Sequence, residues 1–254
     1  MSKQDLTVYP LKDTEKRKNV KDMYPLVSPP FFLGILGKVA AGKTTILNNL
    51  ILRFYKDAFD VVILISSTAK NDPVNASLIE HCDFVFTDYS EEILKTMIEM
   101  IESDRSDSRY LIILDDVIGD VKQKKSGDVD YITALSTKYR HIGNEDYEGK
   151  VSFIIVSQYF KYLSVILRQN LSGLYLCGRF PAQEIKKIAE AFSYFGGSDN
   201  AFLDIYKRSR KGKYDFCFLN VQALEARRNH GEILWKDDED DFKPEDEIEE
   251  VEKN

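Results

Sequence analysis

The sequence predicts an α/β fold with a mostly parallel central sheet covered by helices on both faces. Short apolar runs of strand length alternate along the chain with segments whose apolar residues recur at helical spacing. The strand-like runs are apolar at nearly every position, which is typical of parallel strands that are buried on both faces. Ligands in such sheets bind at the carboxyl ends of the strands, so we expect a functional site at that edge.

The expected elements follow one another in a regular order. An irregular lead-in over residues 1–28, broken by prolines, precedes the first strand. Apolar runs predict strands over residues 31–36, 61–66, 84–87, 110–114, 151–157, 173–177 and 214–221. Helical spacing, clearest at Ile93, Leu94, Met97, Ile98 and Ile101, predicts helices over residues 43–55, 91–102, 130–140, 182–192 and 199–208.

The length of 254 residues allows one α/β domain, which we place at residues 29–235. The net charge of −7 comes from residues 236–254, which hold 11 acidic and 3 basic side chains. The rest of the chain has 31 acidic and 32 basic side chains, so its charge does not exclude an anionic partner such as DNA. We expect the acidic tail to be disordered; a partner-binding or DNA-mimicking role is the alternative.

Targeting and redox features favour a soluble protein of a reducing compartment. No run of about 18 apolar residues predicts a membrane span, and the N-terminal residues are too polar for a secretory signal. Cys82, Cys177 and Cys217 lack the spacing of metal ligands, and we expect free thiols, buried in the case of Cys177 and Cys217.

Residues 37–44, GKVAAGKT, match the phosphate-binding pattern G-x-x-x-x-G-K-[ST] between a predicted strand and a predicted helix. Backbone N–H groups of such a loop and the helix N-terminus surround phosphate oxygens. Lys43 is expected to reach the β- and γ-phosphates, and Thr44 to bind magnesium. The expected cofactors are therefore ATP and Mg²⁺. The expected nucleotide-binding residues are Gly37, Lys38, Val39, Ala40, Ala41, Gly42, Lys43, Thr44 and Thr45.

Two carboxylates, Asp115 and Asp116, end the predicted strand at residues 110–114. Asp115 is expected to hold the magnesium ion through water. Asp116 would point to the other side of the strand tip and accept a proton from the attacking water. Adjacent acids favour hydrolysis over transfer to another acceptor; the alternative is that Asp116 only caps the next loop.

Gln158 ends the buried strand predicted at residues 151–157. In RecA-like ATPases this strand lies between the strands of the two motifs above, so Gln158 is our candidate for a residue that senses the γ-phosphate or orients the water. Ordinary loop polarity is the alternative.

Two arginines and two basic loops are further candidates. Arg140 or Arg168 could contact the phosphates of a neighbouring subunit or lie in the active site; for either, a solvated side chain is the alternative. Lys122, Lys124 and Lys125 follow the acidic pair and are candidates for contacts to DNA phosphates. A second basic cluster covers residues 207–213. Loops rich in lysine are also often merely solvated.

The series of motifs resembles the genome-packaging ATPases of the FtsK–HerA superfamily found in poxviruses, other large DNA viruses and virophages. The resemblance spans about residues 30–221 and rests on the phosphate loop, the Leu-Asp-Asp strand end, Tyr139-Arg140-His141, Ile155-Val156-Ser157-Gln158 and Ile166-Leu167-Arg168-Gln169-Asn170.

The resemblance implies a RecA-like P-loop core, a pentameric or hexameric ring, and ATP-driven movement of double-stranded DNA into a preformed capsid. It implies capsid or vertex proteins as partners and a location in the virion or the viral factory. It assigns Lys43 and Thr44 to the loop, Asp115 to the metal, Asp116 to the water and Gln158 to the sensor. Many members carry glutamate where this chain has Asp116.

Two other functions are compatible with the phosphate loop. A P-loop kinase for a nucleoside or another small molecule would explain the loop and one acid, but not the adjacent pair. A nucleotide-binding virion component without catalytic activity would explain the loop alone.

Overall fold

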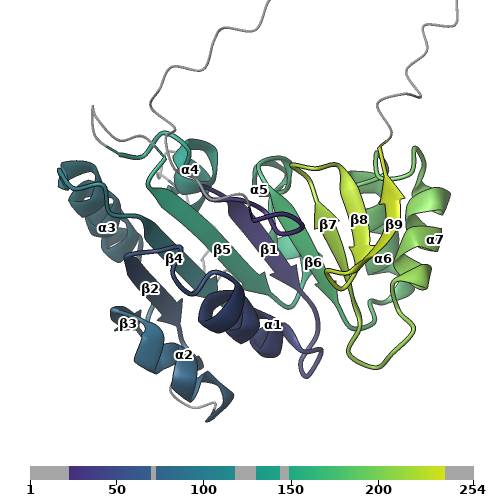
Figure 1. Cartoon of the computed structure of the whole chain (residues 1–254), viewed down its shortest axis with the longest axis horizontal. Helices are drawn as coiled ribbons and strands as arrows, with labels where there is room; N and C mark the ends of the chain where they lie inside the picture. The colour runs from purple at the N-terminus through teal and green to yellow at the C-terminus, as the bar shows by residue number, and fades with distance from the viewer. Residues whose placement is uncertain (1–22, 70–72, 118–129, 144–148, 238–254) are drawn as a thin grey trace, which may run out of the picture.

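A computed structural model of the chain describes residues 23–69, 73–117, 130–143 and 149–237. Its centre is a nine-stranded sheet in the order β3-β2-β4-β5-β1-β6-β7-β8-β9 (Figure 1). The first six strands of this order run parallel, and β7, β8 and β9 continue the sheet in antiparallel pairs. The strands are β1 (Phe32–Leu36), β2 (Val61–Ser66), β3 (Phe84–Phe86), β4 (Tyr110–Asp115), β5 (Val151–Ser157), β6 (Gly173–Cys177), β7 (Phe216–Asn220), β8 (Glu225–Arg228) and β9 (Glu232–Lys236).

Helices cover both faces of the sheet, as predicted. Leu47, Leu50 and Leu78 pack on one face and come from α1, a following π-helix and α2. The other face is covered by α3, α4, α5, α6 and α7. The helices are α1 (Lys43–Asn49), the π-helix (Leu50–Phe54), α2 (Ala76–His81), α3 (Glu91–Ser103), α4 (Tyr131–Lys138), α5 (Val165–Gln169), α6 (Ala182–Ala191) and α7 (Asp199–Arg208), with 3₁₀ turns at Pro73–Asn75 and Phe160–Tyr162.

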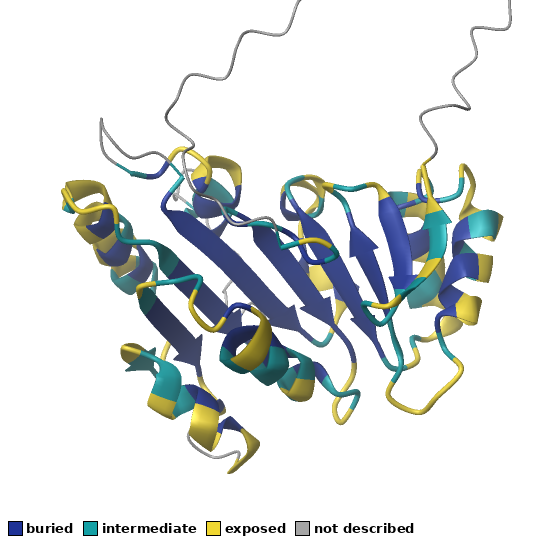
Figure 2. Ribbon diagram, viewed as in Figure 1, coloured by how far each residue is buried: buried dark blue, intermediate teal, exposed yellow. Residues whose placement is uncertain are grey.

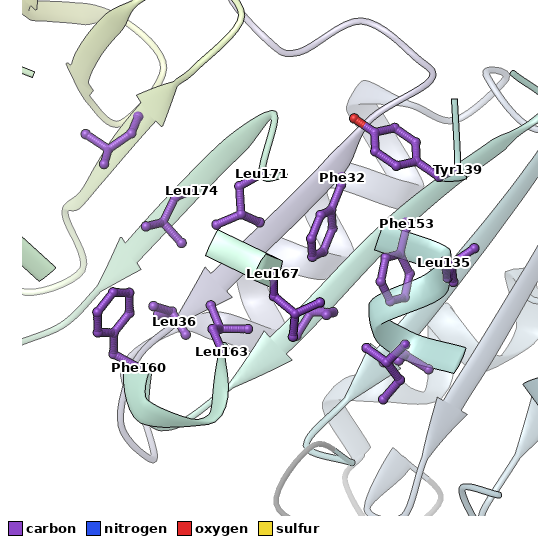
Figure 3. Packing of buried hydrophobic residues seen from close by; sticks show 14 of the residues in the cluster. Phe32, Leu36, Leu135, Tyr139, Phe153, Phe160, Leu163, Leu167, Leu171 and Leu174 are labelled. Carbon is purple, nitrogen blue, oxygen red and sulfur yellow. The ribbon is translucent and has the colours of Figure 1, made fainter. Parts of the chain in front are cut away.

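The central strands are buried on both sides, which explains why their sequences are apolar without alternation (Figure 2). Successive residues of β1 point to opposite faces: Phe32 belongs to one hydrophobic cluster and Leu33 to the other. The rings of Phe32 and Phe153 stack at 4.9 Å between centroids, beneath Leu167 of α5 (Figure 3). Packing on both faces holds the central strand ends in place.

The helix predicted for residues 43–55 begins as expected but changes type before its end. Its α-helical part stops at Asn49, and a π-helix continues to Phe54. The Tyr55 N–H donates to the Leu50 carbonyl at 2.7 Å, one residue further back than in an α-helix. At the end of this wider turn, the buried Tyr55 hydroxyl donates to the Val27 carbonyl at 2.6 Å.

Several elements lie beyond the sequence predictions. The short helices α2 and α5 and the strands β8 and β9 have no counterpart among the predicted elements. Leu26 and Val27, from the segment expected to be an irregular lead-in, are buried in the core. Residues 1–22 of that lead-in and 238–254 of the acidic tail lie outside the described residues.

The thiol predictions agree with the structure: Cys82, Cys177 and Cys217 are free, and the last two are buried. Among the described segments, none of the helices combines the length and apolar character that a membrane span requires.

Candidate active site

Strand β5 lies between β1 and β4 and brings the predicted motifs together (Figure 1). At the carboxyl edge, the Gly37 N–H donates to the Ser157 carbonyl at 3.2 Å, and the Asp116 N–H donates to the Val156 carbonyl at 3.1 Å. Gln158 follows Ser157 directly and is therefore flanked by the phosphate loop on one side and the acidic pair on the other. The expected site is thus assembled at one edge of the sheet.

The phosphate loop turns sharply between β1 and α1. Ala40 and Gly42 have positive φ angles of 59° and 92°, and Gly42 is the residue that precedes α1. Lys43 is only 8% exposed, and its Nζ donates to the Lys38 carbonyl at 3.3 Å across the loop. The structure therefore holds the Lys43 ammonium group inside the turn of the loop, where it can meet an anion.

Gly37 permits a close approach between this loop and β6. A Cβ at Gly37 would lie 2.7 Å from the Cys177 carbonyl oxygen and 2.9 Å from its Cβ. The neighbouring thiol is sealed in the core, and this burial raises the pKa of Cys177 to about 12.

We expect Gly37→Ala to lower the free energy of unfolding by about 1–3 kcal/mol, because β6 backbone must move to admit the methyl group. The same shift displaces the loop, so affinity for ATP should fall as well. Gly231→Ala is the matched control, since nothing lies within 4 Å of its Cβ position. Urea unfolding and nucleotide titration measure both effects; equal stability of the two variants would contradict the prediction.

Asp115 is nearly buried, and its carboxylate accepts a hydrogen bond from the Ser66 hydroxyl at 3.0 Å. Ser66 is opposite Asp115 in the register of β2 and β4, so neighbouring strands orient the carboxylate. Within the described residues, no cluster of three or more His, Cys, Asp or Glu side chains suits a metal ion. A single carboxylate and the Thr44 hydroxyl nevertheless fit Mg²⁺, which takes few protein oxygen ligands when substrate phosphates complete its shell.

Asp116 has a φ angle of 55° and is partly buried. Gln158 Nε2 donates to Asp116 Oδ2 at 3.0 Å, which joins the candidate sensor directly to the candidate base. The alternative role of Asp116 is to cap the loop that follows it. Most of that loop lies outside the described residues.

Arg140 lies at the other edge of the sheet from the phosphate loop of its own chain. Its Nε donates to the Tyr139 hydroxyl at 2.8 Å, and that hydroxyl is 2.8 Å from Ser172 Oγ. Ser172 in turn accepts a hydrogen bond from the N–H of Phe32, where β1 begins. The phosphate loop starts where β1 ends, a strand length of roughly 13 Å away. Arg140 therefore lies far from the phosphate loop of its own chain.

Arg168 lies beside the segment that follows the sensor. Its guanidinium carbon is 3.8 Å from the centre of the Phe160 ring, and its Nη2 donates to the Phe160 carbonyl at 3.2 Å. Its Nε has no hydrogen-bond partner within the described part of the chain, and burial lowers the pKa of Arg168. The side chain borders a surface pocket of about 700 Å³ shared with Lys187 and Glu190.

The predicted DNA-contact residues Lys122, Lys124 and Lys125 lie outside the described residues. The second basic cluster is described: it begins in the last turn of α7 and continues into the following loop, where Lys211 Nζ pairs with Glu232 at 3.2 Å.

Sequence reasoning missed a set of aromatic residues beside the phosphate loop. Phe54, Tyr214 and His230 line the same pocket as Lys43 and Thr44. They come from the π-helix, the start of the last predicted strand and the turn between β8 and β9, so no local pattern links them.

Comparison with known proteins gives the family. The model of the poxvirus A32 protein family matches residues 20–224. The chain belongs to the poxvirus A32 protein family. This membership confirms the resemblance to genome-packaging ATPases that the motif series indicated. A search among curated proteins finds no match to the chain.

Solved structures confirm the RecA-like P-loop fold. The genome packaging NTPase B204 from Sulfolobus turreted icosahedral virus 2, in complex with ATP-gammaS, is 14% identical, with a TM-score of 0.58 over 81% of this chain and 98% of that chain. B204, the DNA-packaging ATPase from Sulfolobus turreted icosahedral virus, is 13% identical, with a TM-score of 0.56 over 79% and 97%. The pCW3 conjugation coupling protein TcpA is 15% identical, with a TM-score of 0.52 over 82% and 60%.

Proposed function

We propose that this chain is a DNA-packaging motor that hydrolyses ATP to move double-stranded viral DNA into a preformed capsid. The observation that supports this most strongly is the convergence of the phosphate loop, the acidic pair and Gln158 at one edge of the sheet. Membership of the poxvirus family and the similarity to packaging NTPases, one of them in complex with ATP-gammaS, support the same function.

In the proposed site, the triphosphate lies in the turn of the loop. Backbone N–H groups and the N-terminus of α1 surround its oxygens, and the Lys43 ammonium group neutralises the terminal phosphates. Thr44 and Asp115 would hold magnesium. Magnesium held there would supply positive charge that offsets the negative charge growing on the phosphate oxygens. The hydroxyl of Ser66 keeps Asp115 turned toward this position.

Asp116 is the proposed base. Gln158 occupies Oδ2 of this carboxylate, which leaves Oδ1 to accept a proton from a water molecule that attacks the γ-phosphorus. The same amide group of Gln158 is the proposed sensor. Because the amide contacts the base, a change in its hydrogen bonding when the γ-phosphate leaves would reorient the carboxylate.

We place the motor in a ring of five or six copies, in the virion or the viral factory, docked on capsid or vertex proteins. In such a ring Arg140 faces the nucleotide of a neighbouring copy, because its own phosphate loop lies at the other edge of the sheet. Arg168 is the second candidate for a subunit contact, through the pocket that it borders.

Duplex DNA should raise the rate of ATP hydrolysis, and salt should oppose this effect. If Lys122, Lys124 and Lys125 neutralise three phosphates, apparent DNA affinity falls about 40-fold between roughly 50 and 200 mM salt. Alanine at all three positions should weaken the stimulation and leave the DNA-independent rate unchanged. Steady-state phosphate release with and without duplex DNA measures this.

The second basic cluster supplies the matched comparison for that experiment. Alanine at Lys207, in the last turn of α7, and at Lys211 and Lys213 in the loop after it removes the same charge from this cluster. A greater loss of stimulation in this variant would assign the DNA contact to residues 207–213 instead. No stimulation by DNA at any salt concentration would contradict the motor function.

The alternatives are less well supported. A kinase would need only one acid at the end of β4, whereas this chain has two, with Gln158 bound to the second. A non-catalytic component would need neither Asp116 nor its partner. Phosphoryl transfer to a nucleoside, in place of water, would favour the kinase.

A further inference from the structure

A pocket of about 660 Å³ opens beside the phosphate loop and has two chemically different ends. One end is formed by the loop and the start of α1, with Lys43 and Thr44. The other end is aromatic, with Phe54, Phe216, Tyr214 and His230. An anionic group suits the first end, and a flat neutral group suits the second. In a nucleotide, the phosphates are the anionic group and the base is the flat neutral group.

The aromatic end is built by segments far apart in the sequence. The His230 ring packs edge-on against Phe54, with 5.2 Å between centroids, and lies 5.2 Å from Phe216. These rings form one wall of the aromatic end. Tyr214 is different, because 66% of the residue is exposed and its Cδ1 lies 4.0 Å from the position that a Cβ on Gly42 would occupy. Its ring stands at the mouth of the pocket against the phosphate loop.

The polar side chains of this end are already engaged within the chain. Asn229 accepts a hydrogen bond from the Phe216 N–H at 3.1 Å and donates to Asp215 at 3.0 Å. Asn49 donates to the Thr45 carbonyl at 2.8 Å and accepts from Arg53 at 2.9 Å. Both amides are therefore held in orientations set by the protein and not by a ligand.

His230 does not bring charge into the pocket. Its Nε2 lies 3.2 Å from the Tyr175 hydroxyl, inside a group of aromatic rings. Burial, together with the nearby Arg227, lowers the pKa of His230 to about 4. The ring is thus neutral at pH 7, and its neutral form suits an uncharged base better than a phosphate.

We propose that the aromatic end holds the nucleotide base, that Tyr214 stacks on it, and that the site discriminates weakly between ATP and GTP. Stacking accepts any base because every base has an aromatic face, whereas selection of one purine needs polar groups aimed at its edge. The proposal rests on the proposed function, since it assumes that the triphosphate occupies the phosphate loop.

The test is a set of titrations of the full chain with magnesium. The ligands are the non-hydrolysable β,γ-methylene analogues of ATP and GTP, with inorganic tripolyphosphate as the reference that has no base. We expect Tyr214→Ala to weaken both analogues about tenfold and to leave tripolyphosphate affinity unchanged. Tyr214→Phe should keep the affinity of the parent, because it keeps the ring. The parent should bind the two analogues with affinities within about tenfold of each other.

Two further variants distinguish a failure of the proposed base site from a failure of the proposed nucleotide site. Phe84→Ala removes a half-exposed aromatic side chain of β3 that does not line this pocket, and it should change nothing. Lys43→Ala should weaken all three ligands. Should Tyr214→Ala weaken the analogues less than about threefold, or weaken tripolyphosphate equally, the base lies elsewhere. A preference for one analogue above about tenfold also overturns the proposal. Unchanged binding in Lys43→Ala would instead overturn the proposed nucleotide site itself.

Discussion

Replacing Lys43 with alanine should lower the turnover of ATP by about 10³-fold or more. The ammonium group is held inside the turn of the phosphate loop, 3.3 Å from the Lys38 carbonyl, and it is nearly buried. Removing one preorganised group that stabilises charge in the transition state costs about 10²–10³-fold in kcat, and loss of nucleotide affinity adds to that. Steady-state release of phosphate is the measurement.

Lys95→Ala is the matched control for this loss. Lys95 is an exposed lysine of α3 whose ion pair, among the residues that the structure describes, is with Glu99 on the same helix, at 3.6 Å. It should keep the turnover of the parent. Thermal unfolding of both variants checks that each is folded. A folded Lys43→Ala variant with undiminished turnover would exclude the phosphate loop as the hydrolytic site.

Asp116→Asn should lower kcat by about 10²–10⁴-fold while the affinity for ATP changes little. The substitution keeps the shape of the side chain and removes its ability to take a proton. Asparagine also tolerates the φ angle of 55° at this position, so the backbone need not move. Its amide oxygen can still accept the hydrogen bond of Gln158. Phosphate release and titration with a non-hydrolysable analogue separate the two effects.

Asp116→Glu provides the complementary variant, because it restores a carboxylate one methylene further from the backbone. We expect it to keep at least about a tenth of the parent turnover. The carboxylate can again accept a proton, but its changed position makes the proton transfer less efficient. If Asp116→Asn instead hydrolyses ATP at the rate of the parent, Asp116 is a capping residue of the next loop, and another group prepares the water.

Local sequence was sufficient for the central strands and for the motifs at their ends. Strands β2, β5 and β6 have the predicted bounds, because a run such as VVILIS can be stable only where both faces are covered. The pattern of residues 37–44 gives the loop, since its glycines permit backbone angles that other residues resist. The position of β5 between the two motifs was expected from the strand order of RecA-like ATPases, whereas the hydrogen bond between Gln158 and Asp116 is a finding of the structure.

Other parts depend on contacts that no local pattern contains. Strand β8 has the sequence EARR, which does not resemble a strand. It pairs with β7 and β9 in the sheet. Within it, the nearly buried Glu225 pairs with Arg227 at 2.6 Å and accepts a hydrogen bond at 3.1 Å from the Tyr24 hydroxyl, about 200 residues away in the chain. The sequence therefore predicts no strand here, because the partners that satisfy these charges come from distant parts of the chain.

The sequence by itself therefore determined the fold class, the family and the residues expected around the phosphates. Those features are encoded by short segments whose hydrophobicity and backbone freedom act locally. The tertiary structure decided that Arg140 lies at the edge of the sheet opposite the phosphate loop, and it built the aromatic end of the pocket from Phe54, Tyr214 and His230. Such features arise from packing between distant segments, and the free energy of that packing depends on the whole chain.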